Sequence, residues 1–93
     1  MNIHSIAERM NDKVANAGFD RSVKFDAGSD GVIVVHGAAV STTDAPTDCT
    51  IKLSLDHLDQ LVSGELNPTM AYMTGKLTID GDLSVAVALS RIL

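Results

Sequence analysis

The sequence predicts an α+β fold in which helices cover one face of a mostly antiparallel sheet. Most segments with the two-residue periodicity of strands cluster in the first half of the chain, and segments with helical periodicity lie before and after them. A chain of 93 residues is long enough for one domain, and we expect residues 1–93 to form it.

An amphipathic helix is predicted near the N-terminus. Asn2 or Ser5 can cap its start, and Ser5 forms a capping-box pattern with Glu8. Gly18 is well placed to end it. The apolar side chains recur at steps of three and four residues and form one stripe: Ile3, Ile6, Ala7, Met10, Val14 and Ala17.

A hairpin is predicted after this helix. Val23 and Phe25 alternate with polar residues, and the stretch 26–31 contains two glycines that suit a turn. The unbroken β-branched run at 32–35 is typical of a strand that is covered on both faces. A short third strand is expected at 37–40.

The next strand follows a polar loop at 41–47. Cys49, Ile51, Leu53 and Leu55 alternate with polar residues, which indicates a half-buried strand.

The second half of the chain is mostly helical. A helix is expected to begin behind Ser54 or Asp56 and to end at Gly64. Asn67 and Pro68 start a shorter helix that contains Met70, Ala71 and Met73 and ends at Gly75.

A fifth strand and a last helix complete the chain. The alternation at 76–80 places Leu77 and Ile79 on one face of the strand, and Asp82 caps a helix that runs to the C-terminus.

This last helix is apolar around almost its whole circumference. A helix of this kind must be buried on several sides or must face something apolar. A deep groove, a partner chain or a bound lipid would each satisfy it. The apolar residues are Leu83, Val85, Ala86, Val87, Ala88, Leu89, Ile92 and Leu93.

Composition excludes several classes of function. The net charge is -5 and the basic residues are scattered, which argues against nucleic acid and against stable attachment to or insertion into membranes. The single cysteine, Cys49, cannot form an internal disulfide, which favours a reducing compartment. Because no signal peptide or bilayer-spanning run is recognised, we expect a cytoplasmic protein.

No catalytic or metal-binding pattern is present in the sequence. His4, His36 and His57 lie on separate elements without the spacing of metal ligands. Cys49 points to the apolar side of its strand and is expected to be an inert core thiol. We therefore expect no catalytic residue, no metal and no cofactor, and the chain is not predicted to be an enzyme.

Three segments resemble the sterol carrier protein type-2 family, also called non-specific lipid-transfer proteins. They are Asp48–Leu53 with the sequence Asp-Cys-Thr-Ile-Lys-Leu, Gly64–Pro68 with Gly-Glu-Leu-Asn-Pro, and Gly75–Asp82 with Gly-Lys-Leu-Thr-Ile-Asp-Gly-Asp. In the family pattern, as in this chain, an apolar helix follows the third segment.

The resemblance implies a five-stranded sheet and an apolar cavity that accepts fatty acyl chains, acyl thioesters or sterols. The chain is shorter than the eukaryotic members, so we expect either a smaller cavity or one that is open at the Leu93 end, and in both cases a poorer fit for sterol. The residues predicted to line it are Phe25, Val34, Leu61, Met70, Met73, Leu77, Leu83, Val87 and Leu89.

Two functions remain open at this point. In the first, the chain binds an apolar small molecule without catalysis and carries it or presents it to an enzyme or membrane. In the second, it is a structural or accessory domain without a cavity, and its last helix docks onto a partner enzyme or onto a second copy in a homodimer. Retained lipid would support the first, and a ligand-free dimer the second.

Overall fold

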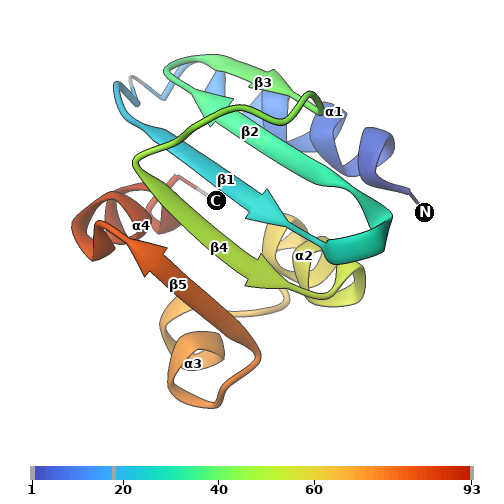
Figure 1. Ribbon diagram of the computed structural model, residues 1–93, viewed down its shortest axis with the longest axis vertical. Coiled ribbons are helices and arrows are strands. Elements are labelled where there is room, and N and C mark those ends of the chain that lie inside the picture. Colours follow the sequence, from blue (N-terminus) through green and yellow to red (C-terminus); the bar gives the residue numbers. More distant parts are fainter. Residues whose placement is uncertain (1, 18, 93) are drawn as a thin grey trace.

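The computed structural model describes residues 2–17 and 19–92, and its five strands form one sheet in the order β3-β2-β1-β4-β5 (Figure 1). Neighbouring strands are antiparallel except for β1 and β4, which are parallel. The predicted five-stranded, mostly antiparallel sheet is therefore confirmed. The strands are β1 at Ser22–Asp26, β2 at Val32–His36, β3 at Ala39–Ser41, β4 at Cys49–Leu53 and β5 at Leu77–Gly81.

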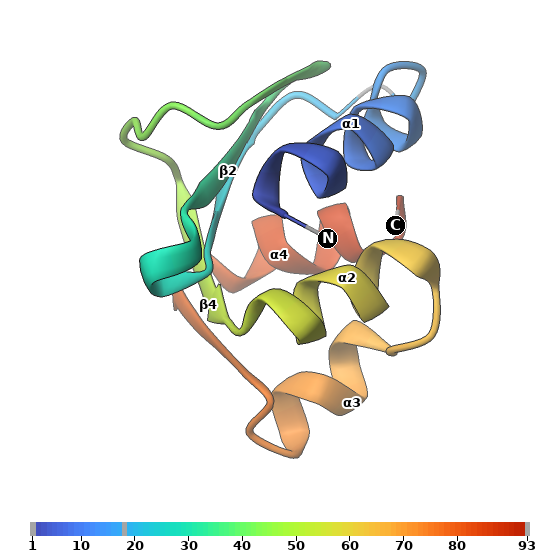
Figure 2. The same ribbon diagram turned by 90° about the vertical axis from the view of Figure 1, so that its right-hand side faces the viewer.

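The helices lie on one face of this sheet, as predicted. Figure 2 shows the sheet close to edge-on, with α1, α2 and α4 on one side of it and α3 below. The helices are α1 at Ile3–Val14, α2 at Leu55–Ser63, α3 at Pro68–Met73 and α4 at Leu83–Ser90, and a short 3-10 turn spans Gly28–Asp30.

Helix α1 begins at a reciprocal cap. Ser5 N–H donates to the Asn2 side chain at 2.9 Å, and the Asn2 N–H donates to the Ser5 hydroxyl at 3.3 Å. The cap is therefore Asn2, and the alternative with Ser5 and Glu8 is not formed. The helix ends at Val14, so Ala17 lies beyond it and is exposed. Gly18, predicted to end the helix, lies outside the described residues.

The face of the sheet away from the helices is partly covered by the 42–48 segment, which crosses it between β3 and β4 (Figure 1). Lys24 on β1 pairs with Asp44 of this segment at 2.6 Å. On β2, Ile33 and Val35 belong to the helix-side core, whereas Val34 is buried but does not belong to that core. Because successive strand residues face opposite sides, Val34 lies on the outer face, and β2 is covered on both faces as predicted.

The elements of the second half are bounded by local caps. The Ser54 hydroxyl accepts the His57 N–H at 3.2 Å, so the strand ends at Leu53 and Leu55 begins α2. Gly64 ends α2 in the left-handed conformation. Asn67 caps α3 and Asp82 caps α4, as the sequence predicts. Leu93, predicted at the end of the last helix, lies outside the described residues.

Candidate functional site

An apolar pocket of about 180 Å³ lies between the β4–β5 side of the sheet and helices α3 and α4. No charged side chain is among its lining residues, and the polar atoms of the lining side chains are the hydroxyls of Thr69 and Tyr72. The lining residues are Phe25, Ile51, Leu61, Pro68, Thr69, Tyr72, Leu77, Ile79, Leu83, Ala86, Val87 and Leu89.

The sheet supplies the floor of the pocket. Phe25, Ile51 and Ile79 are register partners on β1, β4 and β5, so they form one row across three adjacent strands. Leu77 lies two residues before Ile79, on the same face of β5. The floor therefore depends on the parallel β1–β4 pairing, because that pairing brings Phe25 beside Ile51.

Helix α4 forms one wall, and its side chains divide into two groups. Val85, Ala86 and Leu89 are buried, which docks the helix against its own fold. Leu83 and Val87 also line the pocket but remain 47% and 46% exposed. The pocket is therefore open to solvent along these two side chains. Helix α4, which is apolar around almost its whole circumference, thus borders the pocket on one side and solvent on another.

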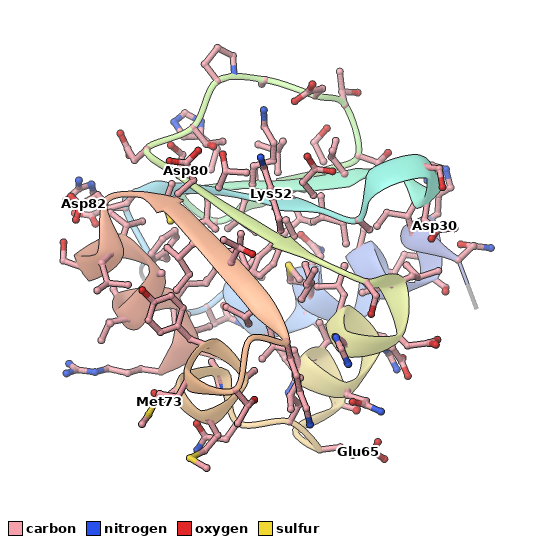
Figure 3. The ribbon with its side chains drawn as sticks, turned by 60° about the horizontal axis from the view of Figure 1, so that its bottom comes forward. Asp30, Lys52, Glu65, Met73, Asp80 and Asp82 are labelled. Carbon is pink, nitrogen blue, oxygen red and sulfur yellow. The ribbon has the colours of Figure 1, made fainter. Side chains whose placement is uncertain are left out.

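Helix α3 forms the opposite wall through Pro68, Thr69 and Tyr72. The two methionines of this helix do not line the pocket. Met70 is 55% exposed and Met73 is 73% exposed, and Figure 3 shows Met73 directed outward from α3. Thr69 and Tyr72 are three residues apart and share one face, whereas Met70 and Met73 share another.

The structure brings together most of the residues that the sequence predicts as lining. They are Phe25, Leu61, Leu77, Leu83, Val87 and Leu89. Val34 does not take part, because it faces the other side of the sheet, and Met70 and Met73 face solvent.

Several lining residues were not predicted. Ile51 and Ile79 could have been found from strand phase, because Ile51 alternates with Cys49 and Leu53, and Ile79 shares a face with Leu77. The others carry no such sequence signal: Pro68, Thr69, Tyr72 and Ala86.

A family model described as the SCP-2 sterol transfer family matches residues 6–93. The chain belongs to this family.

Curated relatives of this family member are much longer proteins. Hydroxysteroid dehydrogenase-like protein 2 of Danio rerio is 36% identical over 73 residues, which is 76% of this chain and 15% of that protein. Sterol carrier protein 2 of Bos taurus is 34% identical over 56 residues, covering 60% of this chain and 10% of that protein. The chain therefore spans only a small part of the relatives it matches.

Solved structures of SCP-2 proteins share the fold. Sterol carrier protein 2 of Yarrowia lipolytica, in an apo form, matches with a TM-score of 0.65 and 28% identity over 95% of this chain and 76% of that one. Palmitated SCP2L2 of Aedes aegypti matches with a TM-score of 0.78 and 20% identity, and the match covers 99% of this chain and 94% of that one. The likeness to the mosquito protein shows the fold alone.

A cluster of charged side chains in this SCP-2 chain anchors the start of α4. The Nε atom of Arg21 lies 3.5 Å from Oδ2 of Asp48, and its Nη2 atom lies 3.3 Å from Oδ2 of Asp82. Hydrogen bonds from Ser22 to Asp48, and from Ser84 to Asp82, lower the pKa of each carboxyl group, and Arg21 lowers both further. Both carboxylates are therefore ionised near neutral pH, and the wall helix is held at its N-cap, Asp82.

The site offers contact with apolar molecules and little other chemistry. Burial raises the pKa of the Cys49 thiol, and nearby carboxylates raise it further, so the thiol is a poor nucleophile. Within residues 2–17 and 19–92, no group of three His, Cys, Asp or Glu side chains could hold a metal ion. In the same part of the chain, no helix has the length and apolar character needed to cross a bilayer.

Proposed function

We propose that residues 1–93 form a non-catalytic lipid-binding domain that holds one alkyl chain in the pocket between β5, α3 and α4. The observation that carries this proposal is the apolar lining, in which Leu83 and Val87 stay half-exposed at the opening. An alkyl chain would cover both side chains and remove apolar surface from water, which contributes about 25 cal/mol per Å². Carriage of the lipid to an enzyme or membrane would follow from its reversible binding.

The dimensions of the pocket favour a single chain over a sterol. Its volume of about 180 Å³ is below the roughly 300–1,000 Å³ of ordinary small-molecule pockets. A flexible chain can follow a narrow, half-open pocket, whereas a fused ring system needs a wider one. We therefore propose fatty acyl chains, free or as thioesters, as the ligands.

A docking role is the second candidate, and the exposed apolar side chains favour it. In that role Leu83 and Val87 on α4 would contact a partner enzyme or a second copy of the chain. In either role we propose a cytoplasmic location, because Cys49 is a free thiol, buried in the core.

A series of fatty acids of increasing length tests the lipid-binding role. Each methylene that enters the pocket should contribute about 0.8 kcal/mol, so affinity should rise about fourfold per carbon and then level off when the pocket is full. Isothermal titration calorimetry measures the slope, and native mass spectrometry shows whether one lipid stays bound. A flat series, together with a ligand-free dimer in the mass spectrum, would support docking instead.

A further inference from the structure

We propose that Arg91 binds the anionic headgroup of the lipid whose alkyl chain fills the pocket. This inference rests on the lipid-binding role proposed above and names the chemical class of the ligand. The class is a single-chain amphiphile that ends in a carboxylate or a phosphate.

The position of Arg91 follows from helical spacing. Leu83, Val87 and Arg91 are four residues apart, so they lie on one face of α4 and its last turn. Arg91 keeps right-handed helical backbone angles, with φ -74° and ψ -19°. Because helical side chains lean toward the N-terminus, the Arg91 side chain lies over the turn that holds Val87. Val87 lines the pocket and is half-exposed, so Arg91 lies one helical turn beyond the opening, on the same side of the helix.

Arg91 is available for a ligand. Within the described part of the chain it has no ion-pair partner, whereas Arg9 pairs with Asp59, and Arg21 pairs with two carboxylates. No lining residue carries a charge that could compete for an anionic headgroup or repel it. The exposed Arg91 side chain is therefore the cation that a headgroup would meet at the α4 side of the opening.

Lys76 is a less suitable partner. It lies in the turn before β5, which begins at Leu77, and not on the α4 side where Leu83 and Val87 are half-exposed.

Guanidinium chemistry sets the class of headgroup. Its planar array of N–H donors matches a carboxylate or a phosphate and forms paired, charge-assisted hydrogen bonds. A fatty alcohol has the same chain but no charge, so it should bind through the pocket alone. An arginine at the end of a helix also stabilises that helix through its dipole, and this effect is present without any ligand.

The experiment compares decanoate, decyl phosphate and decanol by isothermal titration calorimetry on the full chain. We expect the wild type to bind at least one of the two anions on the order of fivefold more tightly than decanol. Arg91→Ala should remove this difference and leave the affinity for decanol unchanged. Lys52→Ala is the matched control, because Lys52 lies on the outer face of the sheet, away from the pocket (Figure 3).

The outcomes separate the two proposals. If none of the three molecules binds, the lipid-binding role itself fails. If all bind, but Arg91→Ala keeps the preference for anions, the role of Arg91 is overturned. A lower melting temperature of Arg91→Ala with an unchanged preference would also overturn it, because the residue would then act on the helix alone. The affinities of decanoate and decyl phosphate, compared with each other, show whether the headgroup is a carboxylate or a phosphate.

Discussion

Gly81 joins the last strand to the helix that forms the pocket wall, and its backbone requires glycine. Its φ is +104°, and a Cβ placed there would lie 2.7 Å from the carbonyl oxygen of Asp48 and 3.2 Å from the Cα of Cys49. The same Asp48 oxygen accepts the Asp82 N–H at 3.3 Å. The close approach of β4 and the start of α4 therefore leaves no room for a side chain at this position.

Replacing this glycine should be costly. Gly81→Ala should lower the free energy of unfolding by about 3 kcal/mol, because it adds both backbone strain and a clash with backbone atoms. Gly75→Ala is the matched control: its φ is +77°, but no atom lies within 4 Å of the added Cβ. Strain alone should cost about 1 kcal/mol there. Urea unfolding measures the free energy of unfolding of both variants. Equal losses in Gly81→Ala and Gly75→Ala would contradict the steric argument.

The lining residues were predictable where the strand period applied and unpredictable where it did not. Phe25 and Leu77, which the strand period places on the apolar face, both line the pocket. The run at 32–35 is apolar at every position, so its sequence does not show which residues face the helices, and Val34 lies on the face away from the pocket. Met70 and Met73 lie on a helix of only six residues, and so short a segment carries no periodicity that shows which side chains face the sheet.

At the scale of elements, α3 is the least anchored wall of the pocket. Ala71 is its one buried residue, and the helix is only six residues long. The tight turn at its end is held by the Lys76 N–H, which donates to the Ala71 carbonyl at 2.8 Å. A wall of this kind depends on a few side chains, so the contribution of each to lipid binding can be measured.

The two faces of α3 should differ in their effect on ligand affinity. Tyr72→Ala removes a lining ring and should weaken fatty acid binding by about tenfold, because the pocket loses a large apolar contact surface. Met73→Ser changes an exposed side chain on the other face and should leave the affinity within about twofold. Fluorescent fatty acid displacement measures both. A larger effect from Met73→Ser would place the ligand on the outer face of α3.

At the scale of the whole molecule, Asp48 connects the start of β4 with β1 and, through Arg21, with the start of α4. Its carboxylate accepts hydrogen bonds from the N–H and the hydroxyl of Ser22 at 3.2 and 3.1 Å, and it lies 3.5 Å from Arg21. Arg21 also reaches Asp82 at the start of α4. The sheet and the pocket wall are therefore linked through carboxylates that must stay ionised.

Stability should fall in acid for this reason. The pKa values of Asp44, Asp48 and Asp82 are lowered in the folded state, so their contribution is complete above the unfolded value of about 4 and is lost as the pH falls below it. Urea midpoints between pH 6 and pH 2 measure the loss. Asp48→Asn should be less stable at pH 6 and show a shallower acid dependence, whereas Asp30→Asn, on an exposed turn, should follow the wild type.

The order of elements was predictable from local signals, but the order of strands was not. Caps act within a few residues, so the sequence located Asn67 and Asp82 and narrowed the start of α2 to Ser54 or Asp56, of which Ser54 is the cap. The pairing of β1 with β4 joins segments separated by the whole β2–β3 hairpin, and no local pattern encodes it. The pocket floor depends on that pairing, so the sequence could indicate its residues but not their arrangement.

The parallel β1–β4 pair also determines which amide hydrogens should resist exchange. These two strands have neighbours on both sides, whereas β5 has only β4 beside it, and α3 packs against this edge strand. Fluctuations that separate the pocket walls can therefore occur at the edge while the middle of the sheet keeps its hydrogen bonds. A cargo molecule could enter and leave through such local openings at a rate much faster than that of global unfolding.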